Sequence, residues 1–188
     1  MNCPLKDPSQ SKLGSVTNDQ RMAEVRFSLA CELNASELHS LRKILAEDHA
    51  DNEVLKEKVG ELTKDQVDGL LIGSIDLVYH TGGKFYVIDW KSNRIGSSAG
   101  SYDLDSMSKE IFKHKYHLQY TLYAAVLHQH MTNIGYPGWN YETSFGGCHY
   151  LFMRAFGCDD QGTGDFFHKP KLKTIEAVLE LMKPKQQN

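Results

Sequence analysis

The sequence predicts an α/β domain in which a central mixed β-sheet is flanked by helices. Three kinds of segment indicate this: two strand-like runs joined by a glycine pair, two stretches with apolar residues at helical spacing, and one further buried strand. These segments are 70–80 and 84–91 around Gly82-Gly83, then 35–59 and 109–131, and finally 145–156. With 188 residues, 40% of them hydrophobic, the chain can build one domain with its own core.

Composition and charge exclude several classes of protein. The formal net charge of −3 gives no bulk sign of a nucleic-acid-binding protein, so such a role needs a local basic patch. The four cysteines show no CxxC spacing, which leaves neither a zinc nor an iron-sulfur site indicated. No run reaches the roughly 18–20 apolar residues of a membrane span, and the first residues lack the apolar core of a secretory signal. We expect reduced thiols and a cytoplasmic location.

The amino-terminal part divides at about residue 20. Residues 1–20 are polar, contain two of the five prolines and show no period, so we expect a poorly ordered lead-in before a domain of residues 21–188. Residues 24–29 then alternate as a short strand, with Val25 and Phe27 on one face and Glu24 on the other. From this pattern alone, Glu24 is a solvated strand residue.

Two long helices are expected. Residues 35–59 begin at a cap, Asn34 or Ser36, and have a possible break near Asp48. Residues 109–131 form the second helix, with an apolar stripe that we expect in the core and histidines at its surface. The stripe comprises Ile111, Leu118, Leu122, Val126 and Leu127, and the histidines are His114, His117, His128 and His130. Gln119 and Tyr123, four residues apart, project from one face and on pattern alone are boundary residues.

The segments between and after these elements read mainly as loops. Residues 94–106 are rich in glycine and serine and predict a mobile loop. Residues 136–142 form a turn, and residues 159–165 form a glycine-rich loop. A basic cluster then precedes a last helix at 173–182; it is either a solvated face or a contact for a phosphate backbone. The cluster consists of His168, Lys169, Lys171 and Lys173.

The glycine pair sets the register of the predicted hairpin. If the turn is centred on Gly82-Gly83, paired residue numbers sum to 165, so Asp76 lies across from Asp89. Like charges that oppose each other in this way repel, so a shared proton, a nearby cation such as Lys91, or a divalent metal ion must offset them. Alternatively, one carboxylate caps a strand end in solvent. A three-residue turn would place the two aspartates on opposite faces.

Four segments together resemble a known family. GSIDLV, VIDWKSN, YHLQYTLYAAVLHQHM and FGGCHYLF resemble, in order and spacing, the C-terminal nuclease domain of the RecB subunit of exonuclease V. That domain is a member of the PD-(D/E)xK, or restriction-endonuclease-like, superfamily. The resemblance runs from about Leu13 to the C-terminus. It implies a restriction-endonuclease-like core and a Mg²⁺-dependent deoxyribonuclease, with Mn²⁺ as a possible substitute, that acts in DNA end processing and recombinational repair.

The resemblance also implies roles for individual residues. Two carboxylates and a backbone carbonyl would bind the metal, a lysine would orient and polarise the attacking water, a glutamate would join the active site, and a Gln/Tyr pair would contact the substrate strand. These residues are, respectively, Asp76, Asp89 and the Trp90 carbonyl, then Lys91, Glu24, and Gln119 with Tyr123.

Two departures from the family pattern shape these expectations. No segment with the family's metal-ligating histidine precedes Glu24, so we expect weak activity. No helicase motif is present either, so we expect DNA that is single-stranded or unwound at its ends, and as partners a helicase or other exonuclease V-like subunits. One alternative is a weak or inactive remnant that serves as a DNA-binding or protein-docking module. Another is a small-molecule metallohydrolase, which would need a closed apolar pocket.

Overall fold

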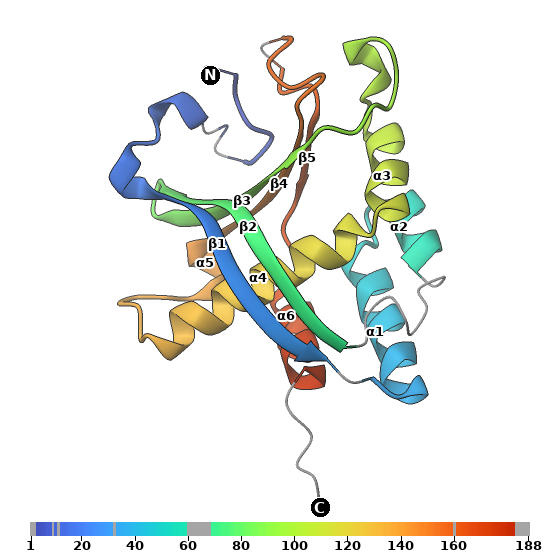
Figure 1. Cartoon of the computed structure of the whole chain (residues 1–188), viewed down its shortest axis with the longest axis vertical. Helices are drawn as coiled ribbons and strands as arrows, with labels where there is room; N and C mark the ends of the chain where they lie inside the picture. The colour runs from blue at the N-terminus through green and yellow to red at the C-terminus, as the bar shows by residue number, and fades with distance from the viewer. Residues whose placement is uncertain are drawn as a thin grey trace, which may run out of the picture.

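The computed structural model describes residues 3–8, 10, 12–31, 33–59, 69–159 and 161–182. These residues form one five-stranded mixed sheet in the order β1-β2-β3-β4-β5, in which only β3 and β4 are parallel neighbours (Figure 1). The strands are β1 (Arg21–Cys31), β2 (Gly69–Thr81), β3 (Lys84–Lys91), β4 (Phe145–Phe152) and β5 (Asp165–His168). The predicted α/β class is therefore confirmed, although β5 lies where the sequence predicted a loop and a basic cluster.

The hairpin between β2 and β3 has the predicted turn and register. Gly82 and Gly83 both have positive φ, 57° and 75°, as a two-residue turn between twisted strands requires. The paired residues run from Thr81 with Lys84 to Leu77 with Ile88, and every pair sums to 165. The turn therefore places β2 and β3 as the sequence predicted.

Six α-helices and three short 3-10 turns complete the described structure. They are α1 (Ala35–Asp48), α2 (Glu53–Lys58), α3 (Leu104–Lys113), α4 (Tyr116–Asn133), α5 (Tyr141–Ser144) and α6 (Leu172–Leu181), with η1 (Leu13–Ser15), η2 (Asn18–Gln20) and η5 (Ala99–Ser101). Asn34 caps α1 by accepting the Glu37 N–H at 2.9 Å, so this predicted start is confirmed. The predicted break after Asp48 is also present.

The helix predicted over 109–131 is instead two helices. Lys115, with φ of 59°, separates α3 from α4 in the left-handed conformation. A residue with this backbone cannot continue a right-handed helix, so the chain changes direction there. The sequence gives no sign of the break, because a lysine at this position carries none of the glycine or proline signals that normally mark one.

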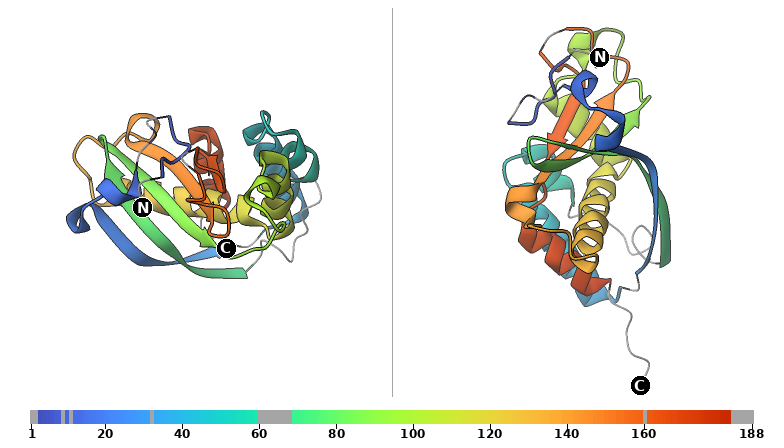
Figure 2. Two further views of the ribbon diagram at one scale, coloured as in Figure 1. Left: turned by 90° about the horizontal axis from the view of Figure 1, so that it is seen from above. Right: turned by 90° about the vertical axis from the view of Figure 1, so that its left-hand side faces the viewer.

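The α-helices cover one face of the sheet, and the amino-terminal segment covers part of the other (Figures 1 and 2). The second face buries Tyr79, Tyr86 and Ile88 against Cys3 and Leu5, and Leu5 is only 1% exposed. The Lys6 N–H also donates to the Asp165 carboxylate at 2.7 Å. In the described part of residues 1–20, two apolar side chains therefore anchor a segment whose polar composition predicted poor order.

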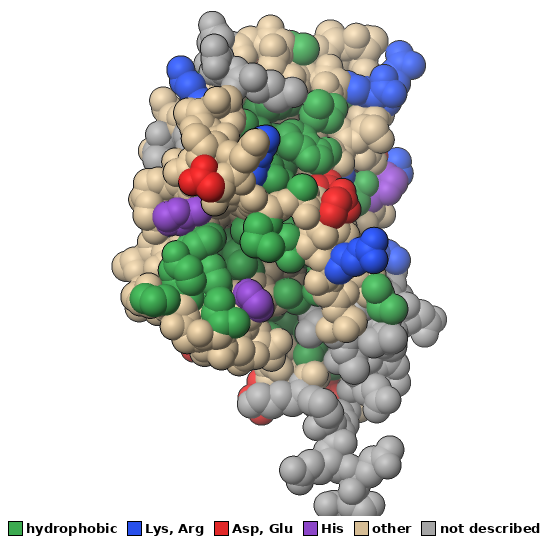
Figure 3. All heavy atoms as spheres, turned by 60° about the vertical axis from the view of Figure 1, so that its left-hand side comes forward, with side chains coloured by type: hydrophobic (Ala, Val, Ile, Leu, Met, Phe, Trp, Pro, Cys, Tyr) green, Lys and Arg blue, Asp and Glu red, His purple; other side chains and the backbone are tan. Residues whose placement is uncertain are grey.

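The surface beside β1 and the amino-terminal segment has a largely apolar character. Figure 3 shows hydrophobic side chains gathered there, with charged groups scattered between them. Met22 and Ile72 are among the exposed apolar side chains of the described residues, at 66% and 75%. Within the described parts of the chain, no helix has the length and apolar character needed to cross a membrane.

Gly146 is required where β4 passes Tyr86. A Cβ atom added at this glycine would lie 2.1 Å from the Tyr86 ring, which is itself buried. We therefore expect Gly146→Ala to lower the free energy of unfolding by about 2–3 kcal/mol through overpacking. The measurement is urea unfolding. Gly100→Ala is the matched control, because its added Cβ would meet only the Ser98 hydroxyl at 4.0 Å; equal midpoints for the two variants would contradict this account.

Candidate active site

The strands β2 and β3 part beside the two aspartates of the hairpin. Their ladder ends at Leu77 with Ile88, one step before Asp76 would pair with Asp89. The Asp76 carboxylate instead accepts the backbone N–H of Trp90 at 2.8 Å. A side chain thus replaces the ladder hydrogen bond at this fork. The backbone carbonyl of Trp90 belongs to the same short stretch of β3.

Glu24 lies on β1 opposite Asp76. The β1–β2 pairs on either side sum to 100, which places these two residues across from each other, but the pairing is interrupted there. The φ of Glu24 is 53°, which is uncommon for a residue other than glycine and is associated with functional sites. Its exposed carboxylate accepts a hydrogen bond from the Ser74 hydroxyl at 3.1 Å. Glu24, Asp76 and Asp89 therefore occupy one row across three strands.

Asp89 and Lys91 form a buried ion pair. Their side chains lie on the same face of β3, with Asp89 Oδ2 and Lys91 Nζ 2.5 Å apart, and the two residues are only 4% and 7% exposed. Burial raises the pKa of the Asp89 carboxyl despite the attraction of Lys91, and the nearby charge of Asp76 raises it further. Burial likewise lowers the pKa of Lys91 despite Asp89. Burial therefore disfavours the charged form of both side chains.

Two residues of α4 complete the surroundings of this pair. Lys91 Nζ donates to Gln119 Oε1 at 3.0 Å and lies 3.6 Å from the centre of the Tyr116 ring. Asp89, Gln119 and the Tyr116 ring thus all contact the ammonium group. The lysine therefore cannot change its direction without losing a partner.

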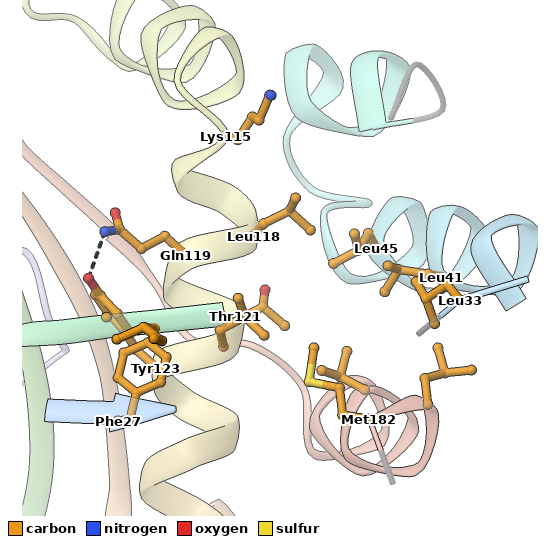
Figure 4. A pocket seen from close by; sticks show the side chains of 15 residues that line it. Phe27, Leu33, Leu41, Leu45, Lys115, Leu118, Gln119, Thr121, Tyr123 and Met182 are labelled. Carbon is orange, nitrogen blue, oxygen red and sulfur yellow. Dashed lines mark hydrogen bonds between the residues drawn. The ribbon is translucent and has the colours of Figure 1, made fainter. Parts of the chain in front are cut away.

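Gln119 and Tyr123 act as one hydrogen-bonded unit, which the dashed line in Figure 4 marks. Gln119 Nε2 donates to the Tyr123 hydroxyl at 2.6 Å, and that hydroxyl lies 2.9 Å from the Ser74 carbonyl and 3.3 Å from Asp89 Oδ1. Burial and the charge of Asp89 raise the pKa of Tyr123, so it remains a donor. The structure thus brings the pair, Lys91 and Asp89 into one network.

Comparisons with known proteins identify the family of this chain. A model of the PD-(D/E)XK nuclease superfamily matches residues 13–176. The chain belongs to the PD-(D/E)XK nuclease superfamily. It is 30% identical over 178 residues to the RecBCD enzyme subunit RecB of Haemophilus influenzae. The matched residues make up 95% of this chain and 14% of that protein.

Other proteins of the same name are similar over shorter stretches. RecB of Buchnera aphidicola is 34% identical over 122 residues, 65% of this chain, and RecB of Escherichia coli is 34% identical over 116 residues, 62% of this chain. In both cases the matched part is 10% of the relative. This nuclease-superfamily chain therefore spans a small fraction of the length of these relatives.

The apolar side of α4 differs from its prediction. Leu118 and Leu122 pack against the core but also line an apolar pocket of about 220 Å³ next to Gln119 and Tyr123 (Figure 4). Half of the eight buried residues of this helix are polar or small, and the other half are large. The first four are His117, Thr121, Ala124 and Ala125, and the others are Tyr120, Tyr123, Leu127 and Met131. Of the predicted stripe, Ile111 and Leu127 are therefore buried in the core, whereas Leu118, Leu122 and Val126 are half-buried at its edge.

Sequence reasoning missed two aromatic residues of the candidate site. The Tyr150 hydroxyl donates to Gln119 Oε1 at 2.9 Å, and its ring lies 4.8 Å from Lys91 Nζ. Tyr116 supplies the nearer ring. The spacing offered a signal for Tyr116, because it lies three residues before Gln119 on the same helical face. Tyr150 is paired with Asp89 in the β3–β4 ladder, and that pairing could not be read from the sequence.

Another group of potential metal ligands occurs in the described residues of this nuclease-superfamily chain. The ligand atoms of Asp48, His49 and His168 lie within 4.8 Å of one another. Each already has protein partners: His168 Nε2 lies 2.7 Å from Asp48, whose other oxygen accepts the Lys171 N–H, while His49 bridges the Leu45 carbonyl and the Tyr120 hydroxyl. We interpret this group as a structural network that ties α1 to β5 and α6.

The structure corrects one expectation, the exposure of His117, and bears on a second, the role of the basic cluster. His117 is completely buried, not at the surface as the sequence predicted. In the basic cluster, His168 bonds to Asp48 and Lys173 lies 2.9 Å from Glu47. Lys171 Nζ also donates to the Glu47 carbonyl, and Lys169 Nζ donates to the Glu142 carbonyl. Because each basic side chain of the cluster has a partner within the protein, the structure favours a structural role for the cluster over a contact with a phosphate backbone.

The Tyr123 hydroxyl gives a test of the nuclease-site network. Tyr123→Phe removes the partner of both Gln119 Nε2 and the Ser74 carbonyl, so we expect a loss of about 1–3 kcal/mol in the free energy of unfolding. Chemical denaturation measures this loss. The control is Tyr136→Phe, at a half-exposed ring for which no hydroxyl hydrogen bond occurs in the described structure. A loss no larger than that of the control would show that the network contributes little.

Proposed function

We propose that this chain is a divalent-metal-dependent DNA nuclease that hydrolyses phosphodiester bonds. The observation that supports this most strongly is the buried pair of Asp89 and Lys91 beside the fork at Asp76. Burying two charges costs free energy that a hydrophobic pair would not, so the presence of this buried pair is explained best by chemistry. Membership of the superfamily supplies the reaction class.

The oxygen atoms at the fork suit a hard cation. Asp76 uses one carboxylate oxygen for the Trp90 N–H, and Asp89 uses its oxygens for Lys91 and Tyr123. In our proposal Asp76, Asp89 and the Trp90 carbonyl hold Mg²⁺, or Mn²⁺ in its place, with water in the other positions, as is usual for Mg²⁺. The cation would supply a Lewis acid that polarises the phosphate and makes water more acidic.

The protein groups would then perform three tasks. Lys91, held by Gln119 and Tyr116, would orient the attacking water and donate a hydrogen bond toward the charge that develops on the phosphate. Gln119 and Tyr123 would keep the lysine and Asp89 in place and border the path of the substrate strand. Glu24, at the exposed end of the acidic row, would face the open side of the site.

The relatives suggest the setting of this activity. They carry the name of a subunit of the RecBCD enzyme. We propose that the substrate is DNA with single-stranded or unwound ends, processed during recombinational repair in the cytosol together with a helicase or other subunits. A weak activity that needs more metal than a site with an added histidine ligand is part of this proposal. The remnant alternative is not favoured, because Asp89 and Lys91 are joined in one network beside Asp76.

The experiment is a digestion series with labelled single-stranded and duplex DNA over a range of Mg²⁺ and Mn²⁺ concentrations. We expect metal-dependent fragmentation, faster on single strands, that a chelator abolishes. Calorimetric titration of the metal runs beside it as an independent readout. Metal binding by a well-folded sample without cleavage of either DNA would overturn the nuclease proposal in favour of the remnant.

A further inference from the structure

Two arginines leave the sheet at the same end as the candidate site. Strands β3 and β4 are parallel, with Lys91 paired with Phe152, and the Met153 N–H extends this pairing to the Lys91 carbonyl at 2.9 Å. Arg94 therefore follows β3, and Arg154 follows β4, at one edge of the sheet, where the two loops lie at the upper end in Figure 1. The carboxyl ends of parallel strands are a common place for ligands.

The two arginines line one cavity. Its volume is about 210 Å³, and Ser97, Ser98 and Tyr102 form part of its wall with them. No carboxylate is part of that wall among the described residues. Both arginines are exposed, so their guanidinium groups can reach a ligand from solvent. The cavity thus combines fixed positive charge, hydroxyl groups and backbone without an opposing negative charge.

The wall of the cavity is held in place by hydrogen bonds. Arg154 Nε donates to the Ser92 carbonyl at 3.0 Å, which anchors this side chain next to β3. The buried Tyr102 hydroxyl donates to the Asn93 carbonyl and accepts the Ile95 N–H, each at 3.3 Å. The loop at 94–106, which the sequence predicted to be mobile, therefore has a defined path around Tyr102. A preorganised site loses less entropy when a ligand binds.

The charges of these arginines are not used elsewhere in the described structure. Neither forms an ion pair there, whereas Lys113, Lys169 and Lys173 each lie within 4.0 Å of a glutamate. In a protein with a net charge of −3, an unopposed pair of arginines is a local basic patch of the kind that nucleic-acid binding requires.

We infer that Arg94 and Arg154 form a subsite for a backbone phosphate of single-stranded nucleic acid, next to the phosphodiester at Lys91. This inference rests on the proposed nuclease function and adds a second contact for the same strand. Arg94 lies three positions after Lys91 in the chain, a reach of at most about 10 Å. That distance covers about three stacked nucleotides of one strand. Arginine is suited to the task because its fork binds phosphate oxygens in pairs. The subsite would contact the phosphate backbone and no base.

The test measures binding without cleavage. A fluorescein-labelled oligothymidylate of 20 nucleotides is titrated with the protein in EDTA, and the affinity is followed by anisotropy over a series of salt concentrations. For the double variant Arg94→Gln with Arg154→Gln, we expect about 10-fold weaker binding at low salt. We also expect the slope of log K against log salt to shrink by about 0.7, the value for one phosphate contact on a single strand.

Two further variants sharpen the comparison. Lys173→Gln removes the same kind of charge from a residue that does not line the cavity, and it should leave the slope unchanged. Arg94→Lys with Arg154→Lys keeps the charge but not the fork, so it should keep the slope while weakening binding. All variants are compared by thermal unfolding to confirm that they are folded.

The outcomes distinguish this inference from the proposed function. A slope in the glutamine double variant equal to that of Lys173→Gln would overturn the subsite, even if the wild-type protein cleaves DNA. A reduced slope in a protein that does not cleave would support the subsite while the nuclease proposal fails. Calorimetry with sodium phosphate covers the other source of the ligand: phosphate binding that the double variant loses, with an unchanged oligonucleotide slope, would assign the cavity to free phosphate and overturn the inference.

Discussion

Lys91→Ala is expected to cleave single-stranded DNA roughly 10²- to 10³-fold more slowly than the wild-type protein, because it removes a positioned donor from the reacting phosphate. Metal binding should persist or become tighter, since the ammonium group that lies 2.5 Å from Asp89 no longer competes with a cation. Single-turnover digestion measures the rate, and calorimetric titration of Mg²⁺ or Mn²⁺ measures the affinity.

Asp89→Ala should differ from Lys91→Ala in the calorimetric titration of the metal. It removes a proposed ligand, so both the cleavage rate and the metal affinity should fall. The control for both is Lys113→Ala, which removes an exposed ammonium group from α3 that contacts Glu110 at 3.6 Å. Equal metal affinities in the two site variants would contradict the assignment of Asp89 as a ligand and Lys91 as a group that acts on the reaction.

Mild acidification is expected to lower the stability of the folded protein. Burial, together with the charge of His168, lowers the pKa of His49 from 6.5 to about 3, and burial lowers that of His117 from 6.5 to about 4. In the unfolded chain both rings take up protons near pH 6.5. Between pH 6.5 and about 4 the unfolded state therefore binds more protons, and the free energy of unfolding falls as the pH falls.

The size of this loss follows from the two rings. Each contributes at most about 1.4 kcal/mol per pH unit, so we expect a loss of about 2–3 kcal/mol between pH 6 and pH 5. Urea unfolding at pH 7, 6 and 5 provides the slope. His117→Leu should remove about half of it, whereas His39→Gln, which changes an exposed histidine of α1, should not. Equal slopes in all three proteins would show that His117 is already charged in the folded state.

The sequence predicted the parts of the fold that depend on local backbone chemistry. The glycine pair determined the turn, the turn determined the register, and the register brought Asp76 toward Asp89. The cap at Asn34 is equally local. Gln119 and Tyr123 were also placed on one helical face by spacing alone.

The parts that were missed depend on contacts between distant segments. Tyr150 reaches Gln119 only because β4 pairs with β3 in parallel, and Leu5 is buried only because the amino-terminal segment crosses the back of the sheet. Neither contact leaves a periodic trace in the sequence. Burial of His117 is hidden in the same way, since a histidine among helical residues is more often at the surface.

The fork between β2 and β3 gives Asp76 a second duty. Its carboxylate accepts a hydrogen bond from the Trp90 N–H at the point where the β2–β3 ladder stops. The side chain therefore makes the last hydrogen bond between the two strands and is also a proposed metal ligand. Asp76→Ala would remove the hydrogen bond to the Trp90 N–H and the proposed metal ligand at once. A loss of activity could then result from separation of β2 and β3 at this end rather than from the loss of the ligand. Asparagine keeps an oxygen for the N–H but lacks the charge. For this residue, the amide is therefore the substitution that isolates chemistry from architecture, and any natural variant with asparagine here would keep the hairpin while losing the cation.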